Sequence, residues 1–235
     1  MSGVKRTMAL TEELAAQAAR PVPDTGPNPG AVYMTEEDYE RVIEQFMSHS
    51  GGDLWVFGYG SLLWKPAFEA TERQRAVVPG WHRAFRFRVA RFRGTRECPG
   101  LMMGLDRGGQ CEGIVLRMPK DRIKEDLGVL LRREMVTVDT PNVPRWLKAH
   151  TPGGPVRAIG FVINPKSPHY AGRLNLEEVA DAVVVAAGHW GSCADYLRQT
   201  VAHLEEIGVH DENLWRLQEL VAQRIHQRLA VEQWS

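Results

Sequence analysis

The stretch Leu54–Trp64 holds the residues of this chain that are best suited to bind a ligand through the main chain. An apolar strand leads directly into Gly58-Tyr59-Gly60-Ser61, and further apolar residues follow at once. Glycine permits positive φ and lets a ligand approach the backbone closely. Successive amides in such a turn suit a carboxylate or a developing oxyanion, and the Ser61 hydroxyl adds a donor. The alternative interpretation is a strand that ends in a tight turn and binds nothing.

Two well-known glycine motifs do not fit this stretch. A dinucleotide-binding fingerprint needs a third glycine at the position of Leu63. A nucleophile elbow needs a glycine two residues before and two residues after its serine, whereas Gly60 directly precedes Ser61 and Leu62 follows it. The sequence therefore favours neither a nicotinamide enzyme nor a serine hydrolase.

Taken with later segments, the stretch resembles the γ-glutamylcyclotransferases, in particular their ChaC-type, glutathione-specific branch. The segments that carry the resemblance, in chain order, are Val56-Phe57-Gly58-Tyr59-Gly60-Ser61-Leu62, Pro79-Gly80-Trp81-His82-Arg83, Gly94-Thr95, Pro99-Gly100-Leu101, Leu130-Leu131-Arg132-Arg133-Glu134-Met135, Asn164-Pro165 with Tyr170, and Gly188 to Leu197. The resemblance spans about residues 54 to 225. Residues 1 to about 50 fall outside it.

The resemblance implies a lyase that cleaves glutathione by cyclising its γ-glutamyl group, giving 5-oxoproline and cysteinylglycine. It implies that Glu134 is the general acid and base, and that neither a metal nor an organic cofactor takes part. The substrate-binding residues that it implies are Val56, Phe57, Gly58, Tyr59, Gly60, Ser61, Leu62 and Tyr170. An exposed Glu is a poor base for an α-amine, so we expect Glu134 to be buried with a raised pKa.

Alternatives remain for several of these residues. Glu134 could pair with Arg132 or Arg133 on a solvated surface. Tyr59 could line the pocket, donate from its phenol or be a plain core residue. Arg91 or Arg93 could meet the glycine carboxylate of glutathione, although a solvent-facing role is the safer assumption in an arginine-rich strand.

Two other functions stay open beside the leading one. The same residues would serve a cyclotransferase for other γ-glutamyl amines or dipeptides, because only the pocket beyond the γ-amide separates the two. The name ChaC has also been attached to cation transport, which leaves a non-catalytic regulator as a rival. The intact glycine motif and the intact glutamate favour an enzyme.

The elements that must position these residues predict an α+β fold rather than a doubly wound parallel sheet, because strands and helices do not alternate one for one. β-Branched and aromatic stretches broken by Gly or Pro predict strands, at 54–59, 74–78, 83–92, 100–105, 111–118, 136–139 and 158–163. Apolar spacing and capping residues predict helices, at 10–19, 35–46, 120–132, 175–188, 192–207 and 211–229. The family resemblance adds a small mixed β-barrel with flanking helices and a helical C-terminus.

The predicted domain organisation has two parts. Residues 1–52 form a helical arm with a linker rich in proline and glycine, and residues 53–230 form the γ-glutamylcyclotransferase-like domain. The sequence does not decide whether the arm packs on the domain or binds a partner, and it does not reveal the oligomeric state.

Composition narrows the function classes. The 29 Lys plus Arg residues balance 29 Asp plus Glu residues, so no electrostatic argument favours a nucleic acid or an anionic membrane. Three widely spaced cysteines fit a reducing compartment, and no histidine or cysteine grouping predicts a metal site. The first 20 residues contain no apolar core typical of a signal peptide, and the apolar run 182–187 is too short to span a membrane. We therefore expect a cytoplasmic protein.

Overall fold

The computed structural model describes residues 6–232, so the first five residues of the predicted N-terminal arm lie outside the described part. The chain divides into two compact units. The first, called here the barrel unit, consists of Pro29–Phe87 and Met103–Gly172. The second, called the helical unit, consists of the chain up to Asn28, Arg88–Met102 and the chain from Arg173 onward. The predicted boundary between residues 52 and 53 stays a prediction.

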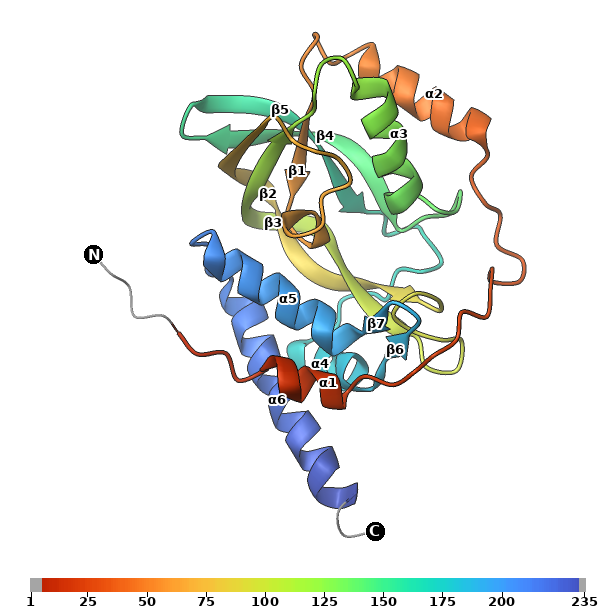
Figure 1. Cartoon of the computed structure of the whole chain (residues 1–235), viewed down its shortest axis with the longest axis vertical. Helices are drawn as coiled ribbons and strands as arrows, with labels where there is room; N and C mark the ends of the chain where they lie inside the picture. Colours follow the sequence, from red (N-terminus) through yellow and green to blue (C-terminus); the bar gives the residue numbers. More distant parts are fainter. Residues whose placement is uncertain (1–5, 233–235) are drawn as a thin grey trace. The chain divides into compact units, whose positions relative to one another are not determined.

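Five strands form the closed barrel, in the order β1-β3-β2-β4-β5, with a further pairing between β3 and β5 (Figure 1). Their bounds are Trp55–Gly58 for β1, Glu72–Val89 for β2, Gly100–Arg117 for β3, Asn142–Thr151 for β4 and Gly154–Ile163 for β5. Strand β1 is antiparallel to β3 and parallel to β5, so the barrel is mixed. The predicted α+β class and the small mixed barrel are confirmed.

Predicted strand boundaries were wrong in three places. Segment 74–78 and residues 83–89 of segment 83–92 belong to the single strand β2, which continues through Pro79 and Gly80, where Gly80 has φ +80°, and ends at Val89. Segments 100–105 and 111–118 likewise belong to β3, which passes through two glycines of positive φ at 108 and 109. Glycine and proline bend these long strands instead of ending them, because the closed barrel needs such bends.

The third error concerns the segment before β4. Residues 136–139 form no strand and contribute one isolated bridge, between Thr137 and Tyr33. The strand lies later, at β4, which pairs along its whole length with β5, from Asn142 opposite Ile163 to Thr151 opposite Gly154. Charged residues and Pro144 break the apolar pattern of β4, and its tertiary pairing overrides this weak propensity.

Two helices belong to the barrel unit, α2 (Glu36–Met47) and α3 (Ile123–Glu134), and they pack against each other (Figure 1). Thr35 caps α2 through a capping box with Asp38, as its residue type favours. The Tyr39 hydroxyl donates to the Met135 carbonyl at 2.7 Å. The later part of the predicted arm therefore packs on the barrel unit, directly beside the end of α3.

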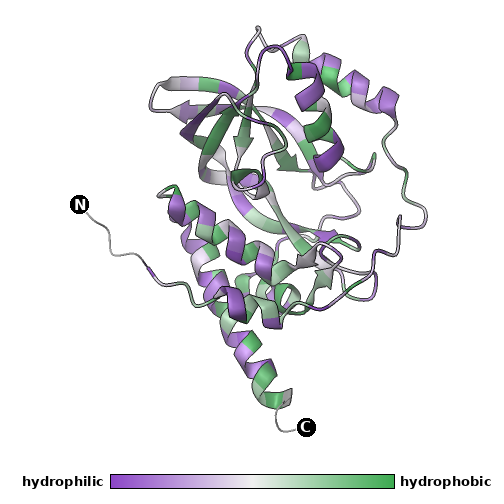
Figure 2. Cartoon of the chain, in the orientation of Figure 1, coloured by the Kyte–Doolittle hydropathy of each residue, from purple (hydrophilic) through white to green (hydrophobic). Residues whose placement is uncertain are grey.

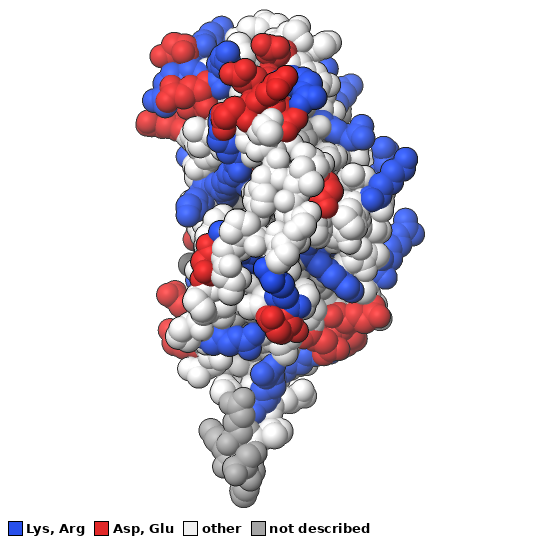
Figure 3. Space-filling model, turned by 90° about the vertical axis from the view of Figure 1, so that its right-hand side faces the viewer, with Lys and Arg blue, Asp and Glu red and all other residues white. Residues whose placement is uncertain are grey.

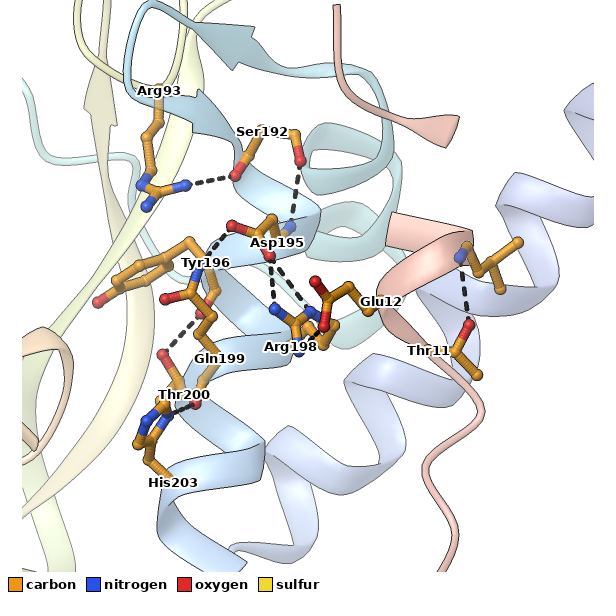
Figure 4. A network of polar contacts seen from close by, with 11 residues as sticks. Thr11, Glu12, Arg93, Ser192, Asp195, Tyr196, Arg198, Gln199, Thr200 and His203 are labelled. Atoms are coloured by element: carbon orange, nitrogen blue, oxygen red, sulfur yellow. Dashed lines mark hydrogen bonds and ion pairs between the residues drawn. The ribbon is translucent and has the colours of Figure 1, made fainter. Parts of the chain in front are cut away.

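The helical unit contains α1 (Glu12–Gln17), α4 (Leu176–Val185), α5 (Cys193–Glu206) and α6 (Glu212–Glu232), with a two-stranded ribbon of β6 (Ala187–Gly188) and β7 (Gly191–Ser192). Polar contacts fix the start of α5, where the Ser192 hydroxyl accepts from the Asp195 amide at 3.1 Å and Asp195 binds Arg198 (Figure 4). The Leu10 amide donates to the buried Gln218 side chain of α6 at 2.8 Å. The earlier part of the predicted arm is thus held in this unit.

Each unit has its own apolar core. The barrel unit buries Phe57, Leu105 and Phe161 completely or nearly so, and hydrophobic residues follow its strands (Figure 2). Polar and apolar residues alternate around α2, whose buried face carries Tyr39, Ile43 and Phe46 (Figure 2). A closed barrel with a filled interior gives the segments attached to it a rigid support.

The surface shown in Figure 3 mixes basic and acidic side chains rather than separating them. The exposed pair Arg132–Glu36, between α3 and α2, is an example of this mixing. Within residues 6–232, no helix is both long and apolar enough to cross a membrane.

Candidate functional site

The candidate site begins where strand β1 ends. Val56 and Phe57 are fully buried and pair with Leu116 and Val115 of β3, so their side chains support the turn from inside the core. Space is tight at Gly58: a methyl group there would lie 3.4 Å from both the Ile114 and Leu62 side chains. The main chain then enters the short 3₁₀ helix η1 (Ser61–Leu63), in which Leu62 is buried.

Two main-chain amides of this turn are left as donors. The buried Arg83 side chain donates from Nε to the Tyr59 carbonyl at 2.7 Å, and the Gly60 carbonyl accepts from the Leu63 amide at 2.8 Å. In a trans peptide the N–H points away from the C=O, so the Gly60 and Ser61 N–H groups face away from these partners. Neither N–H has an acceptor among residues 6–232. They are available to an anion, as expected for a main-chain cradle.

The glycines of this turn do not adopt the positive φ that the sequence suggested. Gly60 has φ −140°, and Gly58 is not among the described glycines of positive φ. The turn therefore does not use the left-handed region that glycine permits. The close packing at this turn accounts for Gly113 on β3, where a methyl group would lie 2.4 Å from the Gly58 carbonyl.

Tyr59 is a core residue in this structure. Its side chain is buried, and its hydroxyl donates to the Phe161 carbonyl of β5 at 2.9 Å. The phenol is therefore used to hold the turn against the barrel, and the main chain of Tyr59 is the part that belongs to the cradle.

Glu134 is the last residue of α3, which continues two residues beyond the predicted helix end at residue 132. Its side chain is 17% exposed, and its two oxygens have different partners. Oε1 lies 3.4 Å from Arg133 Nε, and Oε2 accepts from Asn142 Nδ2 at 3.0 Å. Burial raises the pKa of the Glu134 carboxyl, and the charge of Arg133 and the hydrogen bond from Asn142 partly oppose this rise. A raised pKa brings the carboxyl closer to the value that suits a general acid and base near neutral pH.

Arg133 joins the glutamate to the glycine turn. Its Nη2 donates to Ser61 Oγ at 2.8 Å, and Nη1 donates to the Lys65 carbonyl. Because a guanidinium has donors only, Ser61 Oγ must accept from it, which leaves the Ser61 proton free to donate elsewhere. Arg132 points to a different partner, Glu36 of α2. Glu134 does pair with Arg133, but in a largely shielded place beside the turn rather than on an open surface.

Tyr170 lies in a turn after β5 that is tied to strand β2 and to the turn before β4. Its amide donates to the Ser167 carbonyl at 3.0 Å, and the residue forms a bridge with Phe87 of β2. Ser167 in turn donates to the Asp139 carbonyl at 2.7 Å. Within residues 6–232, no hydrogen bond, ion pair or β-bridge joins Tyr170 directly to Glu134 or to residues 58–62.

Arg91 and Arg93 belong to the helical unit and have partners there. Arg91 pairs with Asp24 at 2.6 Å, and Arg93 donates to the Ser192 carbonyl at 2.7 Å. The idea that they meet the substrate therefore receives no support from their contacts. Figure 4 shows Arg93 directed at Ser192.

Sequence reasoning missed Asn142 and the role of Arg83. Nothing in the residue type of Asn142 marks it, because its contact with Glu134 depends on β4, which was not predicted. Arg83 stands in a strand where alternation predicts aromatic residues inside and arginines outside, yet it is 7% exposed and holds the glycine turn. Its place on the same face as buried Phe85 was the available signal.

Metal-ligating residues are not gathered anywhere in the described part of the chain. His169 lies 3.4 Å from Asp139, and His189 lies 3.6 Å from Asp24. No disulfide joins Cys98, Cys111 or Cys193 to another cysteine in the described part of the chain.

Comparison with known proteins identifies the family. A family model described as ChaC-like protein matches residues 54–224. The "Glutathione-specific gamma-glutamylcyclotransferase" of Escherichia coli (strain K12) is 37% identical over 164 residues, which cover 69% of this chain and 70% of that protein. The "Glutathione-specific gamma-glutamylcyclotransferase 1" of Rattus norvegicus is 29% identical over 211 residues, covering 87% and 89% of the two chains.

A solved structure shows the same fold. The crystal structure of a γ-glutamyl cyclotransferase specific to glutathione from yeast matches with a TM-score of 0.67 at 20% identity, covering 73% of this chain and 96% of that one. The expected barrel with flanking helices is thereby confirmed a second time. Because the family model matches well over half of this chain, the chain belongs to the ChaC-like family.

Proposed function

We propose that this protein is a glutathione-specific γ-glutamylcyclotransferase, a lyase that releases 5-oxoproline and cysteinylglycine from glutathione. The names of its relatives in Escherichia coli and Rattus norvegicus support the substrate. The observation that carries the mechanism is the shielded Glu134 carboxyl, joined through Arg133 to a turn with two available main-chain donors.

The reaction needs no nucleophile from the protein, because both reacting groups belong to the substrate. The α-amine of the γ-glutamyl group attacks its own γ-carbonyl carbon, a new C–N bond closes the five-membered ring, and the bond to the cysteine nitrogen breaks. Holding the arm in a folded conformation supplies the advantage that effective molarities of roughly 10⁵ M or more describe.

In this proposal the protein moves protons and stabilises one oxyanion. Glu134 takes a proton from the substrate ammonium, which frees the amine to attack, and gives it to the departing cysteine nitrogen as the C–N bond breaks. The ring nitrogen keeps one of its three protons, so the second proton that it loses passes to the released amine, which leaves as an ammonium group. For an ordinary Glu, with a pKa of about 4.3, and an amine near 8, the first transfer is uphill by roughly 5 kcal/mol. Raising the pKa of Glu134 by burial narrows this gap.

The glycine turn would receive the negative charge. The Gly60 and Ser61 amides and the Ser61 hydroxyl can donate to the oxygen that becomes an oxyanion or to the α-carboxylate of the substrate. Val56, Phe57, Gly58, Tyr59 and Leu62 would shape this turn, chiefly through the main chain and the core packing beneath it. Tyr170 would complete the substrate pocket, a role that depends on family resemblance alone.

The substrate range is tested by product release. The purified protein is incubated with glutathione, γ-glutamylcysteine and γ-Glu-Ala in the presence of EDTA, and 5-oxoproline is measured in each. Release from glutathione alone supports the proposal. Release from all three indicates a broad cyclotransferase, and release from none overturns the enzymatic function and favours a regulator.

The place of action follows from the substrate. Glutathione is kept reduced in the cytoplasm, and cysteines that form no disulfide among residues 6–232, such as Cys98, Cys111 and Cys193, suit that compartment. We therefore infer a cytoplasmic enzyme that acts on a small molecule and needs neither a nucleic acid nor a membrane. Fractionation of cells that express a tagged chain would check this location.

A further inference from the structure

Asn142 is the side chain that contacts the Glu134 carboxyl from the barrel. It is the first residue of β4, is 7% exposed, and donates from Nδ2 to Glu134 Oε2 at 3.0 Å. The backbone of Asn142 is fixed, because it pairs with Ile163 in the β4–β5 ladder and its backbone N–H donates to Thr140 Oγ1 at 3.2 Å. The side chain can therefore adapt only through its own torsions χ1 and χ2.

The other end of this amide is unsatisfied. Asn142 Oδ1 is buried and has no hydrogen-bond partner among residues 6–232. Leaving a buried acceptor unpaired is destabilising, so such an atom calls for an explanation. A simple structural amide at this position would be expected to use both ends.

The two ends of the amide match the two states of a carboxyl group. A carboxylate only accepts hydrogen bonds and needs the NH₂ end, whereas a carboxylic acid also donates and can bond to the carbonyl end. A half-turn about χ2 exchanges these ends while the side chain keeps nearly the same shape. No repacking of the buried surroundings is needed.

We propose that Asn142 is a positioning residue whose side-chain amide turns over as Glu134 gains and loses its proton, donating from Nδ2 to the carboxylate and accepting at Oδ1 from the carboxylic acid. The inference rests on the proposed function, in which Glu134 must pass through both states in each cycle. With this partner, the carboxyl group keeps one orientation toward the substrate in both half-reactions.

Other groups around Glu134 cannot perform this task. Arg133, on the same helix, has donors only and supports only the ionised state. Arg132 is bound to Glu36 of α2, and Asp139, in the turn before β4, lies beside His169 at 3.4 Å. From the glycine turn, Ser61 and the Lys65 carbonyl reach the glutamate only through Arg133. Asn142 is therefore the described partner that can serve both states.

Nuclear magnetic resonance tests the rotation of the Asn142 side-chain amide in the absence of substrate. The Asn142 side-chain NH₂ signals, assigned by their loss in Asn142→Leu, are followed across pH together with the ¹³C signal of the Glu134 carboxyl. We expect both to titrate with one midpoint, and in Glu134→Gln we expect the amide signals to stop moving with pH. Amide signals that ignore the Glu134 midpoint would overturn the proposal.

Kinetics give the second test. Asn142→Leu is expected to lower kcat for glutathione by about tenfold to a hundredfold, a part of what a general base contributes, while KM changes less than about threefold. Loss of the Nδ2 donor moves the acid limb of the pH profile to higher pH. Asn142→Asp, which keeps the shape and adds a like charge, moves it further.

The matched control is Asn213→Leu, an exposed position on α6. If Asn142→Leu matches this control in kcat and in its acid limb, the proposal is wrong. A wild-type protein that releases no 5-oxoproline would instead overturn the proposed function. The resonance titration would still decide, in that case, whether the amide follows the protonation of Glu134.

Discussion

The two regions that form the candidate site provide opposite kinds of chemistry. The glycine turn, residues 58–62, offers main-chain N–H groups whose direction is set by buried partners such as Arg83 and the Leu63 amide. The end of α3 offers one side-chain carboxyl whose pKa is raised by its surroundings. A main-chain cradle tolerates changes of side chain that leave the turn intact, whereas a carboxyl group does not survive replacement. The two regions should therefore respond differently to mutation.

The largest effect is expected from Glu134→Gln. The variant keeps the shape and the contact with Asn142 but cannot take up a proton, so 5-oxoproline release should fall by about 10²–10⁴-fold or more. Circular dichroism and thermal unfolding should show an intact fold. The matched control is Glu125→Gln on the exposed side of α3, which should retain wild-type turnover. Near-normal activity of Glu134→Gln would remove Glu134 from the mechanism.

Gly60→Val should mainly damage binding. A branched side chain at Gly60 crowds the face on which the main-chain donors lie, so glutathione should bind at least about a hundredfold more weakly, a loss of about 2.7 kcal/mol. Calorimetry in the Glu134→Gln background measures binding without turnover.

The control for this glycine substitution is Gly153 in the turn between β4 and β5. A methyl group there would meet only ordinary contacts, at 3.6 and 3.7 Å, so Gly153→Ala should bind glutathione normally. Unchanged binding by Gly60→Val would refute the main-chain cradle.

Arg133→Met probes the connection between the two regions. Removing this cation takes away the bond to Ser61 and the charge that holds down the pKa of Glu134. Since the base must be ionised, we expect kcat/KM to drop about tenfold at neutral pH and its acid limb to move to higher pH. Arg132→Met, one residue earlier, breaks an exposed pair with Glu36 and a cation–π contact with the Tyr39 ring, and should cost about 1–2 kcal/mol of stability. Identical pH profiles for the two variants would contradict this role.

The sequence predicted the two regions but not the contact between them. The glycine turn and the end of α3 were predictable, because strand-to-glycine transitions and helical spacing are local features. The contact between them was not, because it depends on which of two adjacent arginines faces the turn, and helix rotation is set by the packing of α2 on α3. The sequence Arg132-Arg133 does not indicate which of the two arginines faces the glycine turn.

Long-range pairing set the limits of the fold prediction as well. The barrel followed from family resemblance, and capping residues such as Thr35 and Asn175 predicted helix starts correctly. Strand β4 was missed because its charges and Pro144 hide it, and its pairing with β5 alone makes it a strand. Because β4 was not predicted, its first residue, Asn142, could not be identified from the sequence as the partner of the Glu134 carboxyl.

Stability should reveal the strain that burial places on Glu134. The pKa of Glu134 is raised in the folded state. Its contribution to the free energy of unfolding is therefore complete below the ordinary Glu pKa and is lost as pH rises through the raised pKa. Relative to wild type, Glu134→Gln should therefore be more stable at pH 7 than at pH 4, by about 1.4 kcal/mol for each unit of elevation. Urea unfolding of both proteins at the two pH values measures this difference. An equal difference at both pH values would mean that burial leaves the titration of this carboxyl unaltered.

The smallest effect is expected from Tyr59→Phe, which separates the main chain of the turn from its side chain. The Tyr59 hydroxyl donates to the Phe161 carbonyl inside the barrel, so its removal should lower the free energy of unfolding by about 1 kcal/mol. The Tyr59 carbonyl stays bound to Arg83, which keeps the direction of the Gly60 amide, and KM for glutathione should change less than about threefold. Urea unfolding and initial rates of 5-oxoproline release measure the two quantities. A large rise in KM with unchanged stability would mean that the phenol leaves Phe161 and binds the substrate, and the turn would then act through a side chain as the end of α3 does.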